Sequence, residues 1–292
     1  MAGSNAGRIA RFCFRILRMF SQISDAEFDA FQSFVYSHAG INLHRGKKAL
    51  VCGRLSKRLQ HYRLQTYQEY FDLIQSSNGA VERQICIDLL TTNETYFFRE
   101  PKHFEWLRVY VQQLPASQQL LRVWSAASSS GEEAYSIAMT LADHCQQPWQ
   151  VLGSDISTRV IERASTGHYA MVRAEHIPKD MLKRHCLRGT GKHEGTFLMS
   201  RAIRAQVDFM QVNLNQTLPH LGQFDVIFLR NVMIYFDTPT KQSVVLRLLD
   251  QLRPGGYVCI GHSESLNDID HPLEQVLPSV FRKPEVSFRR RT

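Results

Sequence analysis

The sequence lacks a membrane-spanning segment and a recognisable metal-binding motif. No stretch approaches the roughly 18 consecutive apolar residues of a membrane-spanning helix, so no direct membrane insertion is expected. The cysteines are scattered, with no CxxC pair and no Cys/His cluster at the spacing of zinc ligands. We therefore expect no metal, and reduced, mostly buried thiols in a cytoplasmic protein. The cysteines are Cys13, Cys52, Cys86, Cys145, Cys186 and Cys259.

Acidic residues are outnumbered by basic ones. The 292 residues include 35 lysines and arginines against 27 aspartates and glutamates, which gives a formal net charge of +8 at pH 7. This charge favours an acidic partner, which could be nucleic acid, an anionic membrane or an acidic protein surface. Residues 1–20 contain no acid at all, and their arginines interrupt any secretory apolar segment. We expect this stretch to be a flexible extension ahead of the first domain.

Residues 21–90 show a helical pattern. Ser24 followed by Glu27 is the signature of a capping box at the start of a helix. Apolar residues then recur at helical spacing, which predicts a small all-helical domain.

Within this domain, residues 44–63 predict a strongly basic amphipathic helix. Val51, Leu55 and Leu59 share one side of it, and no acidic residue occurs between positions 44 and 68. The sequence leaves two interpretations equal: a solvated charged face, or a dock for an acidic partner. The basic residues concerned are Lys47, Lys48, Arg54, Lys57 and Arg58.

After residue 90 the pattern changes to short apolar runs that alternate with helical segments. Strands that alternate with helices are joined by right-handed crossovers into a mainly parallel, doubly wound sheet, so we expect an α/β fold. Three glycines in residues 186–203 predict a small antiparallel β insertion. The expected strands lie within 120–127, 150–157, 207–214, 224–236 and 255–265, and the expected helices within 132–145, 157–169 and 239–256.

Small or polar residues follow four successive strands of this sheet. Ligands of doubly wound sheets bind at the carboxyl ends of the strands, near the switch point. Asp155 ends the second strand, where an acid in nucleoside-binding folds accepts hydrogen bonds from ribose hydroxyls. The alternatives are a helix cap for Asp155 and plain turn roles for Asn213 and Asn231. The strand-end candidates are Ala126, Glu132, Asp155, Asn213, Arg230 and Asn231.

The sequence also lacks the GxGxxG turn of dinucleotide-binding folds. The first turn has a single glycine, Gly131, followed by Glu132 and Glu133 in the first turn of the next helix. A helix N-terminus attracts anions, and two carboxylates there would repel a pyrophosphate. A cationic ligand suits the site better, and S-adenosylmethionine has a sulfonium, an ammonium, ribose hydroxyls and no phosphate. Glu132 is expected to hold its methionine amine.

Several segments together resemble the CheR family of chemotaxis receptor methyltransferases. They are TTNETYFFREPKHFEWL at 91–107, RVWSAASSSGEEAYSIAM at 122–139, FDVIFLRNVMIYF at 224–236 and LRPGGYVCIGHSESL at 252–266. The resemblance runs from about residue 24 to residue 281. It implies a Rossmann-like methyltransferase fold and S-adenosylmethionine-dependent methyl esterification of receptor glutamates, with S-adenosylhomocysteine as the product.

The resemblance also implies a division of the chain. Residues 21–90 would be the helical domain, 91–118 a linker region that contributes to the cofactor pocket, and 119–292 the catalytic domain, with its β insertion at about 180–206. The cofactor pocket would be lined by Asn93, Thr95, Arg99, Ala126, Glu132, Asp155, Asn213, Leu214, Arg230 and Asn231.

Arg99 and Tyr235 are expected to orient the substrate carboxylate. The alternatives are cofactor placement for Arg99 and core packing for Tyr235. A glutamate with a pKa of about 4.3 is already ionised at neutral pH, so no general base is needed. Catalysis then becomes in-line positioning in a site with little water, because the carboxylate and the sulfonium lose their charges together.

The partners implied are chemoreceptors, bound by a monomer. The basic helix would face the acidic cytoplasmic helical bundle of the receptor. The β insertion, with Gly189, Gly191 and Gly195, would bind a receptor's C-terminal pentapeptide as an added strand, the alternative being an ordinary surface insertion.

Two other functions compete with this interpretation. A nucleic-acid methyltransferase would use the positive charge, but the Asn/Asp-Pro-Pro-aromatic run typical of amino-methylating enzymes is replaced by RNVMIYF, so no nucleic acid is expected. A non-catalytic receptor adaptor that senses S-adenosylmethionine would keep the same pocket residues.

Overall fold

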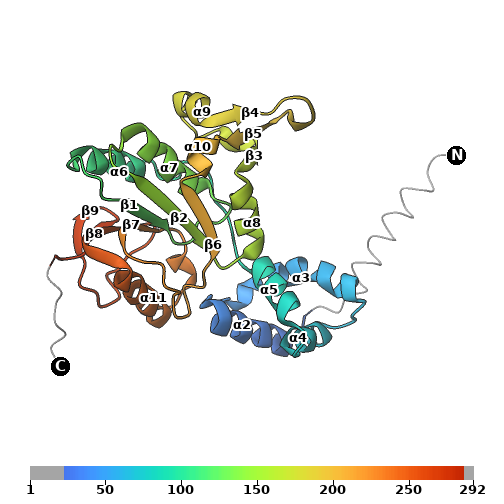
Figure 1. Ribbon diagram of the computed structural model, residues 1–292. Helices are drawn as coiled ribbons and strands as arrows, with labels where there is room; N and C mark the ends of the chain where they lie inside the picture. The colour runs from blue at the N-terminus through green and yellow to red at the C-terminus, as the bar shows by residue number, and fades with distance from the viewer. Residues whose placement is uncertain (1–22, 286–292) are drawn as a thin grey trace. The chain divides into compact units, whose positions relative to one another are not determined.

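A computed structural model describes residues 23–285, and the chain divides into two compact units between Thr92 and Asn93 (Figure 1). The expected N-terminal extension, residues 1–20, lies outside the described residues. Within residues 23–285, no helix has both the length and the apolar character needed to cross a membrane.

The first unit is a bundle of helices. It begins with the predicted capping box: the Glu27 amide donates to the Ser24 hydroxyl at 3.1 Å, and the Ser24 amide donates to the Glu27 carboxylate at 2.7 Å. Gly40 ends the first helix in the left-handed region, with φ of 70°. The elements are α2 (Asp25–Ala39), the 3-10 turn η1 (Arg45–Lys47), α3 (Lys48–Tyr62), α4 (Tyr67–Gln75) and α5 (Ala80–Leu90).

The basic helix α3 is amphipathic as predicted, with Val51, Leu55 and Leu59 fully buried. Its basic residues do not share one role. The Arg54 guanidinium donates to the carbonyl of Leu90, the last residue of α5, at 3.0 Å and to that of the following Thr91 at 2.8 Å, where a cation complements the negative end of the helix dipole. Lys48 forms an exposed ion pair with Asp25 at 2.9 Å.

Arg58, expected on the docking face, is an internal ion-pair partner. It donates through two nitrogens to the carboxylate of Glu82, which is only 4% exposed. Tyr70 and Tyr62 donate to the same carboxylate at 2.7 and 3.0 Å. Burial raises the pKa of Glu82, but these donors together lower it below its usual value. Arg58 therefore stabilises the bundle itself.

The second unit is built on a seven-stranded sheet with strand order β6-β2-β1-β7-β8-β10-β9. Strands β1, β2, β6, β7 and β8 are parallel, as predicted, whereas β10 pairs antiparallel with β8 and β9. The strands are β1 (Leu121–Ser125), β2 (Trp149–Asp155), β6 (Val207–Gln211), β7 (Phe224–Leu229), β8 (Leu252–Ile260), β9 (Glu274–Leu277) and β10 (Val280–Arg282).

Helices cover both faces of this sheet (Figure 1). Strand β1 shows the reason, since successive side chains of a strand point to opposite faces. Val123 packs into one core with α7, and the next residue, Trp124, packs into the other core with α11. The helices are α6 (Lys102–Gln113), α7 (Glu132–His144), α8 (Thr158–Thr166), α10 (Arg201–Arg204) and α11 (Thr238–Asp250), and the 3-10 turn η4 (Met233–Tyr235) precedes α11.

Residues 91–118 were expected to be a linker region, and all of them from Asn93 onward belong to the second unit. They contain α6, which packs against α7 and buries Phe104, Leu107 and Val111. The segment is therefore part of the folded unit.

The predicted β insertion is a three-stranded antiparallel sheet of order β3-β5-β4. The expected hairpin at 186–203 is confirmed as β4 and β5, and Gly191 and Gly195 in its connection have φ of 57° and 77°. The sheet begins earlier than predicted, because a three-residue strand directly after α8 completes it. Its elements are β3 (His168–Ala170), η2 (Met171–Ala174), α9 (Lys179–His185), β4 (Cys186–Arg188), η3 (Gly191–His193) and β5 (Thr196–Met199).

The cysteines of the described residues are free thiols, as predicted, but they are not mostly buried, because Cys52, Cys145 and Cys186 are only half-buried. Cys86 in the first unit and Cys259 in the second are fully buried. Burial raises the pKa of Cys86 to about 12 and also raises the pKa of Cys259. Both thiols are therefore protonated and unreactive in the folded protein.

Candidate functional site

The strand-end residues gather where the strand order reverses. From β1 the chain builds outward through β2 and β6, and it then returns to the other side of β1 with β7. The carboxyl end of β1 therefore lies between those of β2 and β7, with Ser125 paired to Gly153 and Phe228. This is the switch point at which doubly wound sheets bind ligands.

Asp155 ties the turns after β1 and β2 together. Its carboxylate accepts the Ser129 amide at 2.9 Å and the Ser157 amide at 3.0 Å. It remains 8% exposed, and the neighbouring hydroxyls of Ser128 and Ser157 are buried with no hydrogen-bond partner in the described residues. An acid and orphaned hydroxyls at this edge fit a polyhydroxylated ligand such as a ribose.

Gly131 allows α7 to begin at this edge. Its φ is 92°, and a Cβ there would lie 2.9 Å from the Ala164 side chain and 3.0 Å from the Tyr169 hydroxyl. Only glycine satisfies both the backbone angle and the close approach. Ala126, in the same turn, is 1% exposed and donates its amide to the Phe228 carbonyl at 2.9 Å.

Glu132, expected to hold a cationic ligand, already has a cation from the protein. It is fully buried, and two nitrogens of Arg173 donate to one of its carboxylate oxygens. The Ser130 hydroxyl donates to the other oxygen at 2.7 Å. Arg173 lies in η2, and its guanidinium also donates to the Thr95 carbonyl at 2.9 Å. Glu132 therefore forms part of an ion pair.

Glu133 is likewise paired. It accepts from the Ser125 hydroxyl at 2.7 Å and from Arg230 at 2.7 Å. The Arg230 side chain is 1% exposed and also contacts Glu100 at 3.1 Å. Burial alone would lower the pKa of Arg230, but the carboxylates of Glu133 and Glu100 raise it. Any ligand contact of Arg230 is therefore confined to its main chain.

The motif at residues 93–100 is fixed to this edge by main-chain hydrogen bonds. The Asn93 carbonyl accepts the Ser129 hydroxyl at 2.8 Å, and the Phe98 amide donates to the Ser136 hydroxyl at 2.9 Å. The Arg99 carbonyl accepts a bond from Arg230. Phe98 and Glu100 have φ of 54° and 58°, so the segment holds a strained conformation.

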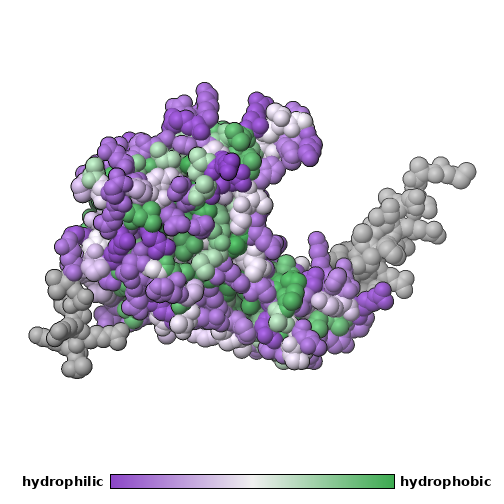
Figure 2. All heavy atoms as spheres, viewed as in Figure 1, coloured by the Kyte–Doolittle hydropathy of each residue, from purple (hydrophilic) through white to green (hydrophobic). Residues whose placement is uncertain are grey.

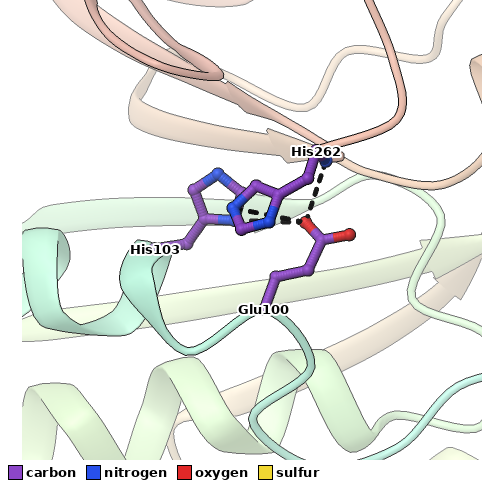
Figure 3. Close-up of side chains that lie close together, drawn as sticks. All are labelled: Glu100, His103 and His262. Carbon is purple, nitrogen blue, oxygen red and sulfur yellow. Dashed lines mark hydrogen bonds and ion pairs between the residues drawn. The ribbon is translucent and has the colours of Figure 1, made fainter.

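The Glu100 carboxylate lies beside two histidines, His103 and His262, whose rings are close to each other (Figure 3). Its oxygens accept from Arg230, from the Asn231 side chain and from the His262 amide, all at 3.1 Å. One potential ligand atom from each of Glu100, His103 and His262 lies within 4.8 Å of the other two, which is close enough to hold a metal ion. We assign no metal to the cluster, because protein donors already occupy both oxygens and the Arg230 charge lies against one of them.

His103 is neutral in this cluster. Burial and the nearby Arg230 charge together lower its pKa to about 3, although the Glu100 carboxylate opposes this change. Its 3.6 Å contact with Glu100 is therefore not an ion pair. Its other ring nitrogen lies 2.9 Å from the Ser279 hydroxyl.

The turn after β6 carries Asn213 and Leu214. The Asn213 side chain accepts the Asn215 amide at 2.9 Å, which is the turn role weighed as an alternative. Arg247 of α11 donates to the Leu214 carbonyl at 3.0 and 2.7 Å. The adjoining Val212 amide donates to the Asp155 carbonyl, so this turn joins the same edge.

The two predicted substrate residues differ in surroundings. Arg99 donates to the Glu94 carbonyl at 3.1 Å, and its guanidinium lies 5.8 Å from the Tyr96 ring centre. Tyr235 ends η4 and is half-buried. The next residue toward β7, Ile234, is 53% exposed, so this turn reaches the surface.

Three functional candidates were missed by the sequence analysis: Glu100, Arg173 and Glu264. Glu100 lies inside the segment 91–107 and Glu264 inside the segment 252–266, so the local sequence marks both of them. Arg173 reaches the site from η2, and no local pattern marks it.

Comparison with known proteins gives a consistent result. The chain matches the model "CheR methyltransferase, all-alpha domain" over residues 26–91 and the model "CheR methyltransferase, SAM binding domain" over residues 93–280. The break between these models coincides with the division into two units.

Named relatives agree. The chain is 41% identical over 254 residues to the chemotaxis protein methyltransferase of Escherichia coli (strain K12), which covers 85% of this chain and 87% of that protein. It is 39% identical over 259 residues to chemotaxis protein methyltransferase 2 of Pseudomonas aeruginosa, covering 87% and 92% respectively. The chain therefore belongs to the CheR methyltransferase family, with the all-alpha domain followed by the SAM-binding domain.

Proposed function

We propose that this protein transfers the methyl group of S-adenosylmethionine to glutamate side chains of chemotaxis receptors and so forms glutamyl methyl esters. The observation that carries the proposal is the site at the switch point, inside a SAM-binding domain, with Asp155 positioned for a ribose. The relatives are named as chemotaxis protein methyltransferases, which supports a chemotaxis receptor as the proposed substrate.

The ion pair of Glu132 and Arg173 suits the amino-acid end of this cofactor. The methionine moiety carries both an ammonium and a carboxylate, and the pair offers one charge of each sign. Glu132 thus keeps its proposed place in the pocket, with Arg173 as the complementary cation.

The chemistry needs orientation more than acid–base catalysis. A receptor glutamate is ionised at neutral pH, and its attack on the methyl carbon neutralises both the carboxylate and the sulfonium. A site with little water favours this loss of charge, and in-line alignment contributes further. In this proposal Arg99 and Tyr235 orient the carboxylate, while Asn93, Thr95, Asn213, Leu214, Arg230 and Asn231 line the cofactor pocket.

The test is methyl transfer from labelled S-adenosylmethionine to receptor-containing membranes, followed by mild alkali. Label released as methanol supports ester formation. Alkali-stable label would point to N-methylation, and cofactor binding without any transfer would favour the adaptor instead.

Tyr235→Phe tests the orienting role with little change in volume. Loss of the hydroxyl is expected to lower kcat by about tenfold or more while leaving cofactor affinity unchanged. Tyr110→Phe is the matched control, because Tyr110 packs against Tyr257 away from the strand-end turns. An unchanged kcat for Tyr235→Phe would contradict the orienting role and favour a packing role for this residue.

We also propose that the small sheet docks an extended receptor tail. Strand β4 is an edge of this sheet, and its Leu187 is 57% exposed. Beside it lies a mainly apolar pocket of about 470 Å³, lined by residues including Leu182, Phe197, Lys183 and Arg188. Figure 2 shows apolar atoms between hydrophilic ones in this region. An added strand could bury an aromatic side chain there and place an acid beside the two cations.

Binding of a fluorescent receptor-tail peptide tests the dock. Lys183→Glu is expected to weaken binding about tenfold, since it reverses a charge at the rim of the pocket. Lys192→Glu, on the exposed turn η3 of the same insertion, is the control. Equal peptide affinity for both variants would count against this surface.

A further inference from the structure

Glu264 follows β8 and turns back toward the loop that follows β7. One of its carboxylate oxygens accepts the Gly261 amide at 2.7 Å and the Asn231 amide at 2.9 Å, and the other accepts the Met233 amide at 2.7 Å. Within residues 23–285 no lysine, arginine or histidine lies within ion-pair distance of it. Backbone amides from two separate loops, and no cation, therefore hold this carboxylate.

These loops start side by side because their strands are parallel neighbours, with Leu229 of β7 paired to Ile260 of β8. They also cross closely. A Cβ on Gly261 would lie 2.7 Å from the Asn231 side-chain nitrogen and 2.8 Å from the Glu264 carboxylate. The crossing leaves no room for a side chain at position 261.

The loop held in this way is strained and carries proposed functional residues. Asn231 has φ of 57°, a left-handed conformation that surrounding contacts must stabilise in a residue other than glycine. Met233 begins the turn η4 that ends at Tyr235. Glu264 thus contacts the main chain at the cofactor residue and at the start of the substrate turn.

We propose that Glu264 is a positioning residue for methyl transfer: its carboxylate fixes the loop after β7 so that Asn231 faces the cofactor and Tyr235 faces the substrate. The inference rests on the proposed roles of those two residues. Glu264 itself touches neither ligand, and it acts only through the backbone amides that it accepts.

A carboxylate suits this task better than an amide does. Both of its oxygens accept, whereas the nitrogen of a glutamine would face the amide donors of the loop. Burial raises the pKa of Glu264, and the amides only partly oppose this rise, so ionising this residue costs stability in the fold. A residue that improves the site at the expense of stability indicates a functional role.

Glu264→Gln is the direct test, with Glu274→Gln on the exposed strand β9 as a control of equal charge change. We expect Glu264→Gln to keep a melting temperature close to that of the wild type. Its kcat is expected to fall by about 100-fold, the loss that accompanies a displacement of the reacting groups by about 1 Å. Cofactor affinity, measured by calorimetry without any receptor, is expected to weaken about tenfold. The KM for receptor membranes is expected to stay unchanged.

Gly261→Ala disturbs the same crossing from the other loop and is expected to give the same pattern. Wild-type kcat and cofactor affinity in Glu264→Gln would overturn the proposal. Activity that returns to the wild-type value when the variant is assayed well below its melting temperature would also overturn it, because the loss would then be one of stability. Failure of the wild type and of Glu274→Gln to form an ester would instead reject the proposed function.

Discussion

Glu132 and Glu133 are adjacent in the sequence, yet each has its own arginine partner from a distant segment. Arg173 lies 41 residues after Glu132, and Arg230 lies 97 residues after Glu133. The sequence shows that two acids begin α7, but it does not show which cations neutralise them. Those pairings depend on the path of the chain through the whole unit, which is why Arg173 could not be predicted.

Removing Arg173 is expected to leave a buried charge unpaired. Arg173→Met should lower the free energy of unfolding by about 2 kcal/mol, a modest value for a buried pair because the arginine is 32% exposed. Denaturant unfolding measures this change, and Arg201→Met on the surface of α10 is the control.

Adding Glu132→Gln to Arg173→Met should recover part of the loss, since the uncompensated charge is then gone. If the double variant is less stable than Arg173→Met by the full cost of Glu132→Gln, the two residues do not interact.

His103 should make stability depend on pH. Its pKa is about 3 in the folded protein and near 6.5 in the unfolded chain, so between these values the unfolded state binds more protons. Stability should therefore fall as the pH drops below 6.5, by up to about 1.4 kcal/mol per pH unit from this residue. Urea unfolding at several pH values measures the slope. His103→Asn should flatten it, and an unchanged slope would show that His103 does not cause it.

At the scale of elements, the periodicity of apolar residues predicted the long strands and helices, whereas the shortest elements were not predicted. The five parallel strands and the helices between them follow apolar runs that are long enough to recognise. Strands β3 and β10 have only three residues each, and they exist because a longer partner strand is already in place. Helix α6 was not predicted, because its residues lie in a segment that was interpreted as a linker carrying a motif.

The start of α7 should be intolerant of any side chain at Gly131. Gly131→Ala combines φ of 92° with contacts of 2.9 to 3.1 Å, and it should lower the unfolding free energy by about 3 kcal/mol. Gly191 also has a positive φ, 57°, but has nothing within 4 Å of an added Cβ. Gly191→Ala should therefore cost only about 1 kcal/mol. Equal losses, measured by thermal or denaturant unfolding, would show that backbone strain alone matters.

At the scale of the whole molecule, the net charge of +8 should act on association with the receptor. Raising the ionic strength from about 0.01 M to about 0.15 M shortens the Debye length from about 30 Å to about 8 Å. The KM for receptor membranes should therefore rise with salt, while cofactor affinity stays nearly constant because its ion pairs are buried. A KM that does not depend on salt would show that long-range electrostatic attraction does not contribute to association with the receptor.

The division into two units matched the change of pattern near residue 90, because a helical bundle and an α/β sheet have different periodicities. The docking roles of the basic helix were less predictable. Arg54 and Arg58 belong to the same basic segment as Lys47 and Lys57 and carry the same charge. Their side chains, however, bind groups within the bundle. Charge reversal at the exposed Lys57 therefore tests the predicted receptor contact without disturbing the bundle, whereas at Arg58 it would also destabilise the unit.

Among residues 23–285, each unit contains one fully buried thiol, whose chemical modification reports on the opening of that unit. Cys86 and Cys259 can be alkylated only when the surrounding core opens, because the folded state keeps them protonated and out of solvent. Following the modification of each cysteine by mass spectrometry would time the opening of each unit in the intact chain. Addition of S-adenosylmethionine should slow modification of Cys259, and any slowing at Cys86 would measure how strongly the bundle is coupled to the cofactor-binding unit.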